Sequence, residues 1–156
     1  YYTVNPQYGT NEDFKRLMAE AHERGITIII DLVLNHTSAQ HPWFIEAQDP
    51  NSDRHDWYLW RETSGAGWHR LGSAYYFGLF WDQMPDLNFE NPAVTDEMLN
   101  VTRFWLEEMS VDGFRLDAIK HLIEEGDQTE NTLLGGQIRH PVGTVDLCLG
   151  RTVHRD

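Results

Sequence analysis

Apolar residues gather in two short runs, and each run ends in polar side chains. The first run is Ile26–His36 and the second is Val111–Ala118. Near-continuous stretches of Ile, Val and Leu are typical of strands that are buried on both faces of a parallel sheet. The pattern therefore predicts two buried strands whose carboxyl ends carry polar groups.

A helix is expected directly before each of these strands. Thr10 is predicted to cap the first helix, with Asp13 as its capping-box partner, and Gly25 is predicted to end it. Asn91 is the expected cap of the second helix, with Pro92 at its first position. Apolar residues recur at helical spacing in both segments: Phe14, Leu17, Met18 and Ala21, then Val94, Met98, Val101, Trp105 and Met109. A helix followed by a buried strand, twice over, indicates an α/β fold.

The segment between the two helix–strand pairs, residues 37–89, has a different character. It shows no long helical period, and prolines, glycines and aromatic residues are spread through it. A long irregular segment within a compact domain is usually functional. Flat aromatic rings could pack against sugar rings, but packing in the core and in loops is the more ordinary explanation for any single ring.

Arg115 and Asp117 form the most informative pair of the second run. Side chains alternate along a strand, so these two point to one face, and Phe114 and Leu116 point to the other. An adjacent arginine favours the ionised form of an aspartate, which is the form that a carboxylate nucleophile needs. The alternative is a buried ion pair that only fixes the strand.

Asp31, Asn35 and His36 stand within and at the end of the first run. Each of them could simply cap a strand or satisfy loop backbone. Polar residues at the carboxyl ends of two parallel strands, however, are where barrel and open-sheet enzymes place their chemistry. The two strand ends together therefore favour a site.

Three motifs in these segments resemble the α-amylase family of glycoside hydrolases, family thirteen. Asp31–His36 is similar to that family's third-strand motif, and Gly113–His121 is similar to its fourth-strand motif. Met84–Asn88 is similar to the signature that separates subgroups, in the form found in α-amylases intermediate between the oligo-1,6-glucosidase and neopullulanase groups. The resemblance runs from Tyr1 to about Asn131.

The resemblance implies a fragment of a (β/α)8 TIM barrel, from the second helix to the fourth strand. A small irregular subdomain would be inserted after the third strand. The expected divisions are residues 1–36 (helix and third strand), 37–89 (inserted subdomain), 90–131 (third helix and fourth strand) and 132–156 (an atypical tail). The tail lacks the helix and fifth strand of the family, and a shifted reading frame, an assembly error and an unusual native tail all remain open.

The chemistry implied by the resemblance is retaining hydrolysis of α-1,4-glucans such as starch and maltooligosaccharides. Asp117 matches the nucleophile, and Arg115 matches the residue that orients it. His36 matches the histidine that binds the reacting sugar, and Lys120 and His121 match residues on the leaving-group side. On a plain interpretation Lys120 is a solvated surface charge.

No cofactor is required for this chemistry. Asn35 matches a position that ligates a structural calcium in many family members, but several relatives lack the ion, so calcium stays open. Asp31 matches an aspartate with a supporting role near the arginine. Asp86 and Asn88 mark the subgroup and are assigned no proton transfer.

The general acid of the family has no counterpart between Ala118 and Asp156. The loop after the second strand contains Glu124, Glu125 and Glu130, but the sequence gives no reason to assign any of them as the general acid. We therefore expect the chain by itself to be inactive and poorly folded. The alternative functions are an α-glucosidase or trehalose synthase of the same family, a non-catalytic relative, and a barrel enzyme of unrelated chemistry.

The composition limits the classes of partner that the chain is expected to bind. The chain has 156 residues, a formal net charge of −13 and 40% hydrophobic residues. Strong acidity argues against nucleic acid or an anionic membrane as a partner, and no apolar run is long enough to predict a transmembrane helix. The single cysteine, Cys148, cannot form an internal disulfide, and the opening Tyr1–Val4 is typical of the interior of a longer chain, so the compartment stays open.

Overall fold

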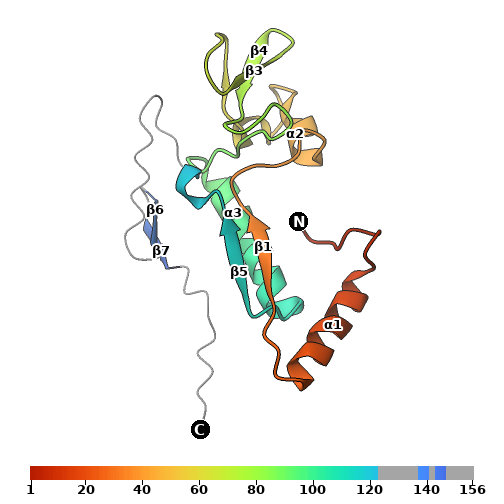
Figure 1. Cartoon of the computed structure of the whole chain (residues 1–156). Coiled ribbons are helices and arrows are strands. Elements are labelled where there is room, and N and C mark those ends of the chain that lie inside the picture. Colours follow the sequence, from red (N-terminus) through yellow and green to blue (C-terminus); the bar gives the residue numbers. More distant parts are fainter. Residues whose placement is uncertain (123–136, 141–142, 147–156) are drawn as a thin grey trace. The chain divides into compact units, whose positions relative to one another are not determined.

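The computed structural model describes residues 1–122, 137–140 and 143–146. Its helices and strands, shown in Figure 1, are α1 (Asn11–Glu23), β1 (Ile29–Val33), α2 (Pro42–Ala47), β2 (Trp60–Arg61), β3 (Trp68–Leu71), β4 (Ala74–Phe77), α3 (Pro92–Arg103), β5 (Gly113–Asp117), β6 (Gln137–His140) and β7 (Gly143–Asp146). Two 3-10 turns, His55–Trp57 and Ile119–His121, and a π-helical segment, Phe104–Glu108, complete the set.

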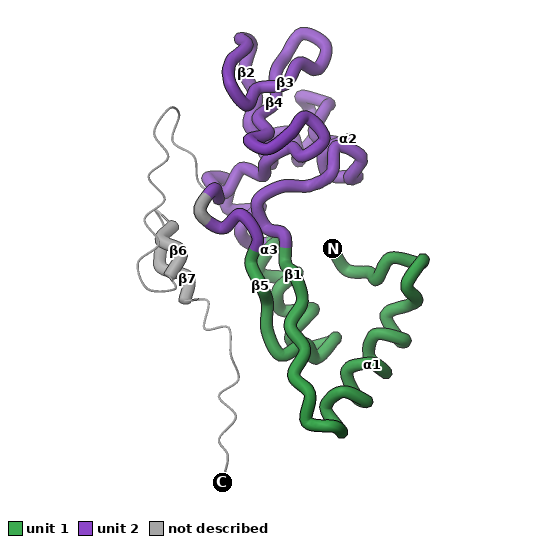
Figure 2. Tube along the Cα trace, viewed as in Figure 1, with its two compact units in different colours: residues 1–32, 97–116, 134–156 green, residues 33–96, 117–133 purple. Residues whose placement is uncertain are grey.

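The chain divides into two compact units (Figure 2). The first unit is built from Tyr1–Leu32 and Glu97–Leu116. The second is built from Val33–Asp96 and the segment that starts at Asp117. In the part of the chain that the structure describes, no helix combines the length and the apolar character that crossing a membrane requires.

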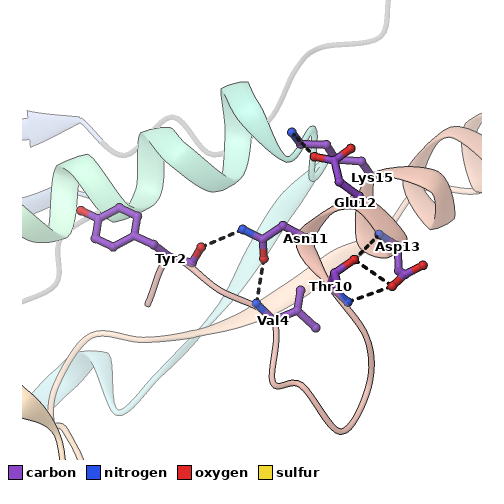
Figure 3. A network of polar contacts seen from close by, with 7 residues as sticks. All are labelled: Tyr2, Val4, Thr10, Asn11, Glu12, Asp13 and Lys15. Carbon is purple, nitrogen blue, oxygen red and sulfur yellow. Dashed lines mark hydrogen bonds and ion pairs between the residues drawn. The ribbon is translucent and has the colours of Figure 1, made fainter.

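Helix α1 begins with the capping box that the sequence predicts. The Thr10 hydroxyl accepts a hydrogen bond from the Asp13 N–H at 3.2 Å, and the Asp13 carboxylate accepts one from the Thr10 N–H at 2.9 Å. Next to it, the Asn11 side chain bridges the backbone of Tyr2 and Val4 (Figure 3). The start of α1 is therefore fixed by side chains that satisfy otherwise unpaired backbone groups.

The far end and the apolar stripe of α1 match the prediction only in part. The helix ends before Gly25, whose φ of 70° is easily adopted only by a residue without a Cβ. Met18 and Ala21 are buried as expected. Leu17 was expected in the stripe, but it is 53% exposed, because no residue among those described covers that side of the helix.

Strands β1 and β5 form a two-stranded sheet and run in the same direction (Figure 1). Both are shorter than the apolar runs that predict them. The expectation that they are buried on both faces is wrong for this structure, because Ile29 is 61% exposed and Arg115 is exposed as well. The physical reason is that the described elements do not cover the side chains of Ile29 and Arg115, and the two-stranded sheet is too narrow for them to be shielded by further strands.

Helix α3 starts at Pro92, and the Asn91 side chain accepts a hydrogen bond from the Ala93 N–H at 3.0 Å. Val94, Met98, Val101 and Met109, four members of the predicted stripe, are at most 3% exposed. Burying side chains of this size contributes roughly 1.5–3 kcal/mol each. The helix continues into the π-helical segment, which the spacing of apolar residues did not predict, and Trp105 there is half-buried.

The second unit contains a small antiparallel sheet in the order β2-β4-β3. Phe44 of α2 lies at the centre of its aromatic core, with ring centroids 5.0 Å from Tyr58, 4.8 Å from Tyr76 and 5.9 Å from Trp60. Half of the aromatic side chains of this segment are buried, and most of the others are partly covered. The sequence predicted an irregular segment and missed both α2 and the sheet, because elements of two to six residues are too short to show a period.

Strands β6 and β7 form an antiparallel hairpin, with Gln137 opposite Asp146 and His140 opposite Gly143. The hairpin falls within the segment expected to be an atypical tail, where no strand was predicted. The three glutamates considered as general acids and Cys148 lie outside the described residues.

Asp112 joins three elements of the first unit. Its carboxylate accepts a hydrogen bond from the Ile28 N–H at 2.7 Å and lies 2.9 Å from Nε2 of His22, near the end of α1. Its own N–H donates to the Ile28 carbonyl at 3.0 Å. One side chain therefore ties the starts of β1 and β5 to each other and to α1.

We predict that Asp112→Ala lowers the free energy of unfolding by about 1–3 kcal/mol, because it removes hydrogen bonds to a charged acceptor and leaves a strand-end N–H unpaired. Urea denaturation of the complete protein, followed by circular dichroism, measures this change. The control is Asp96→Ala, which replaces an exposed aspartate of α3 and should change the value by less than about 0.5 kcal/mol. Equal midpoints for the two variants would contradict the role given to Asp112.

Candidate active site

Asp117 is the last residue of β5, and the chain turns sharply directly after it. Ala118 has a φ of 50°, in the left-handed region that residues with a Cβ seldom adopt. A 3-10 turn follows, in which the His121 N–H donates to the Ala118 carbonyl at 2.9 Å. Backbone strain of this kind is typical of functional sites, where the surrounding structure maintains it.

His36 stands where the first motif meets the Met84–Asn88 signature. It pairs with Asp86 in an isolated antiparallel bridge, and the Leu87 N–H donates to the Asn35 carbonyl at 2.8 Å. Only 8% of His36 is exposed, and Asp86 is buried as well. Two motifs that lie about fifty residues apart in the sequence are thus held side by side by backbone hydrogen bonds.

Burial lowers the pKa of His36, because removal from water disfavours the imidazolium form, and the nearby Asp117 carboxylate acts in the opposite direction. His36 is therefore neutral at pH 7, with one ring N–H as a donor and one ring nitrogen as an acceptor. Asp117 and His36 both belong to the second unit, and the carboxylate is near enough to act electrostatically on the imidazole.

Phe80 completes this group of side chains. Its ring meets His36 edge-to-face, with centroids 5.6 Å apart, and it meets His121 in the same way at 5.5 Å. The rings of His36 and His121, two residues that were predicted separately, therefore both meet one phenylalanine. Lys120 lies in the same 3-10 turn as His121, and only its backbone is described.

Arg115 belongs to the first unit, where its Nη1 donates to the Asp31 carboxylate at 3.3 Å. The supporting position of Asp31 beside the arginine, expected from the resemblance, is confirmed by this ion pair. Both side chains are more than half exposed, so the pair by itself contributes about 0–1 kcal/mol. The orientation of Asp117 by Arg115 stays a prediction.

Asn35 is the residue whose position matches a calcium ligand. It is 1% exposed, and neither atom of its side-chain amide has a hydrogen-bond partner among the described residues. An unsatisfied buried amide costs about 1–3 kcal/mol, and an amide oxygen suits Ca²⁺. The side chain thus fits one calcium ligand, although the described part of the chain holds no group of three or more His, Cys, Asp or Glu side chains arranged for a metal.

Sequence reasoning missed Phe80 and Ala118. A signal for Phe80 was present, since Leu79, Phe80 and Trp81 are three consecutive large apolar residues in a loop. Ala118 carried no signal, because alanine gives no indication of a left-handed backbone.

Comparison with known proteins identifies the family of the chain that carries this site. A family model of the α-amylase catalytic domain matches residues 1–141. The chain belongs to the α-amylase family. The members that are similar in structure are (β/α)8 barrel enzymes of glycoside hydrolase family thirteen, and the helix–strand order α1–β1 and α3–β5 is that of a part of such a barrel.

Individual family members agree with this assignment. Alpha-amylase 3 of Dictyoglomus thermophilum is 48% identical over 130 residues, covering 80% of this chain and 26% of that protein. Trehalose synthase/amylase TreS of Mycobacterium tuberculosis is 43% identical over 149 residues, covering 84% and 25%. The crystal structure of the α-amylase from H. orenii superposes with a TM-score of 0.73 at 44% identity, covering 84% of this chain and 29% of that one. The chain therefore spans about a quarter of the length of these relatives.

The backbone at Ala118 gives a prediction about how Asp117 is presented. We expect Ala118→Val to lower the free energy of unfolding by about 1–3 kcal/mol, because a β-branched side chain is strongly disfavoured at positive φ. Ala118→Gly is the matched variant and should be at least as stable as the parent, since glycine adopts this conformation without a steric penalty. Thermal unfolding of both variants measures the difference, and two equal melting temperatures would contradict it.

Proposed function

We propose that the complete protein containing this chain is a retaining glycoside hydrolase that acts on α-1,4-glucans, with Asp117 as its nucleophile. The observation that carries the proposal is the position of Asp117 at the carboxyl end of β5, beside the buried and neutral His36, in a chain of the α-amylase family. Carboxyl ends of barrel strands are where enzymes of this architecture carry their catalytic residues.

In the proposed reaction the Asp117 carboxylate attacks the anomeric carbon and forms a covalent glycosyl-enzyme, while the leaving oxygen takes a proton from a second carboxyl group. Water then gives a proton back to that second group as it attacks the glycosyl-enzyme, which releases Asp117 and the sugar with its original anomeric configuration. Retaining enzymes need the second carboxyl group about 5–5.5 Å from the nucleophile. No described residue is assigned to this role, so we propose that another part of the complete protein supplies the group.

His36 is proposed to donate its ring N–H to a hydroxyl of the reacting sugar. Its burial supports this role, because the ring is fixed by its backbone bridge to Asp86 and stays neutral, so it presents a donor without introducing a charge. A hydrogen bond that strengthens as the transition state forms raises the rate rather than only the affinity.

Arg115 is proposed to orient Asp117, which lies two residues further along the same strand. Its ion pair with Asp31 supports this, since a guanidinium that is already anchored loses less freedom when it binds a second carboxylate. Lys120 and His121 are proposed to contact the sugar on the leaving-group side, and the ring contact of His121 with Phe80 supports a fixed position for its imidazole.

The preference for α-amylase activity over that of a trehalose synthase or an α-glucosidase rests on sequence. The Met84–Asn88 signature and the pair Lys120–His121 support hydrolysis of longer α-1,4-glucans. Initial rates of the complete protein on starch and on maltose test this choice. A faster reaction with maltose, or trehalose as the product from maltose, would favour the alternatives.

We predict that Asp117→Asn in the complete protein reduces starch hydrolysis by more than roughly 10³-fold, because an uncharged amide cannot form the covalent intermediate. Reducing-sugar release measures this loss, with Asp96→Asn as the surface control. Asp117→Ala adds a more specific readout: with an activated α-glucoside substrate, azide in the space left by the carboxylate should restore turnover and yield a β-glycosyl azide. Retained activity in the Asn variant would favour a barrel enzyme of unrelated chemistry.

Calcium is proposed as a structural ion with the Asn35 amide oxygen as one of its ligands. The buried amide without a described hydrogen-bond partner supports this proposal. Bound calcium would supply structural cross-linking of loops through oxygen ligands and no step of the reaction. Asn35 would then hold the start of the loop that follows β1.

We predict that removing calcium with EDTA lowers the melting temperature of the complete protein by several degrees, because a ligand that binds only the folded state stabilises it. Returning Ca²⁺ should restore the value. In Asn35→Ala the melting temperature should respond less to EDTA than in the parent. An identical melting temperature of the parent with and without EDTA would remove calcium from the proposal. The Asn35 amide would then be a buried polar group without a described hydrogen-bond partner.

A further inference from the structure

Three consecutive large apolar side chains are exposed on one loop of the second unit. Leu79, Phe80 and Trp81 are 36%, 50% and 60% exposed. We call these three residues the aromatic shelf. Contiguous exposed apolar residues on a soluble protein commonly mark a binding surface, whereas single ones do not.

The backbone before the shelf is fixed. The Gly78 N–H donates to the Gly67 carbonyl at 2.8 Å, and the Gly78 carbonyl lies 2.8 Å from Nε2 of His69. A Cβ at Gly78 would lie 2.9 Å from the Met84 carbonyl oxygen and 3.0 Å from that of Trp81. The loop closes so tightly at this point that only glycine fits.

Hydrogen bonds also fix the backbone at the end of the shelf. The Met84 N–H donates to the Trp81 carbonyl at 3.0 Å, and the buried Tyr76 hydroxyl donates to the Asp82 carbonyl at 2.5 Å. The shelf is therefore exposed because an anchored loop holds it outward, and a ligand that binds there does not have to order the backbone first.

The shelf is continuous with the candidate active site. Phe80 meets the rings of His36 and His121 in edge-to-face contacts, so it borders two of the residues that are proposed to bind the sugar. Trp81 is the next residue, and its side chain makes no hydrogen bond or ring contact within the part of the chain that the structure describes. A large flat ring is thus left exposed on the residue that directly follows Phe80.

We propose that Trp81 is a stacking platform for a glucose unit next to the reacting sugar, so that it favours glucans longer than maltose. The proposal rests on the proposed function, because its occupant is the α-1,4-glucan of that reaction. The apolar C–H face of a glucose ring fits the flat indole, and covering an exposed aromatic ring removes a large apolar area from water. An indole also loses little conformational freedom, since it has two side-chain torsions and its backbone is already held.

The experiment compares Trp81→Ala with the parent in the complete protein, using maltoheptaose and maltose as substrates. The ratio of kcat/KM for maltoheptaose to kcat/KM for maltose should fall by roughly tenfold, as expected for losing one aromatic contact, and the change should lie mainly in KM. Trp81→Phe keeps a smaller flat ring, so its ratio should lie between the two. The control is Ile45→Ala, which removes an exposed apolar side chain of α2 in the same unit and should leave the ratio unchanged.

A second readout separates this proposal from the proposed function. Calorimetric titration of maltoheptaose into Asp117→Asn measures binding without turnover, and adding Trp81→Ala to that variant should weaken binding by a similar factor. Three results would overturn the platform: an unchanged ratio, an equal loss on both substrates, or a melting temperature that falls far more in Trp81→Ala than in Ile45→Ala. The last result would mean that another part of the protein covers the indole. A parent that hydrolyses neither substrate but loses maltoheptaose binding on Trp81→Ala would overturn the proposed function and leave the platform standing.

Discussion

The pairing of β1 with β5 is the constraint on which the rest of the structure depends. The two strands come from segments about eighty residues apart, and Asp112 fixes their starts through hydrogen bonds to Ile28. Because the strands run in the same direction, both carboxyl ends emerge at one edge of the sheet, as in other parallel α/β enzymes. Asp117 and the segment that leads to Asn35 and His36 follow directly from those ends.

Within the second unit, the site is built from a buried imidazole, a carboxylate and an aromatic ring. His36 is held by its bridge to Asp86, and its burial keeps it neutral, while the Asp117 carboxylate nearby supplies negative charge. Phe80, which is itself half exposed, packs edge-to-face with the His36 ring. In the proposed reaction, such an arrangement would separate a neutral donor from a charged nucleophile by their surroundings rather than by their chemistry alone.

The sequence predicted much of the first unit, because its signals are local and strong. The capping box at Thr10, the glycine stop at Gly25 and the start of α3 at Pro92 all depend on residues within one turn. The stripe of α3 was predicted for the same reason, whereas the exposure of Leu17 and Ile29 was not, since burial depends on neighbours that no local pattern encodes. The small sheet of the second unit was missed because its strands are too short to alternate visibly.

The candidate site was predicted through motifs rather than through folding rules. The residues of the two strand ends were identified by their order and spacing, and the Arg115–Asp31 pair follows that expectation. Phe80 and Ala118 could not be predicted in the same way: one acts through a loop conformation and the other through its backbone angle. Gly78 is a further requirement that no motif encodes: its tight backbone packing holds the loop that carries Trp81. If Trp81 binds sugar as proposed, new sugar preferences would arise most readily through changes of that ring, because the backbone around Gly78 leaves no room for a larger amino acid.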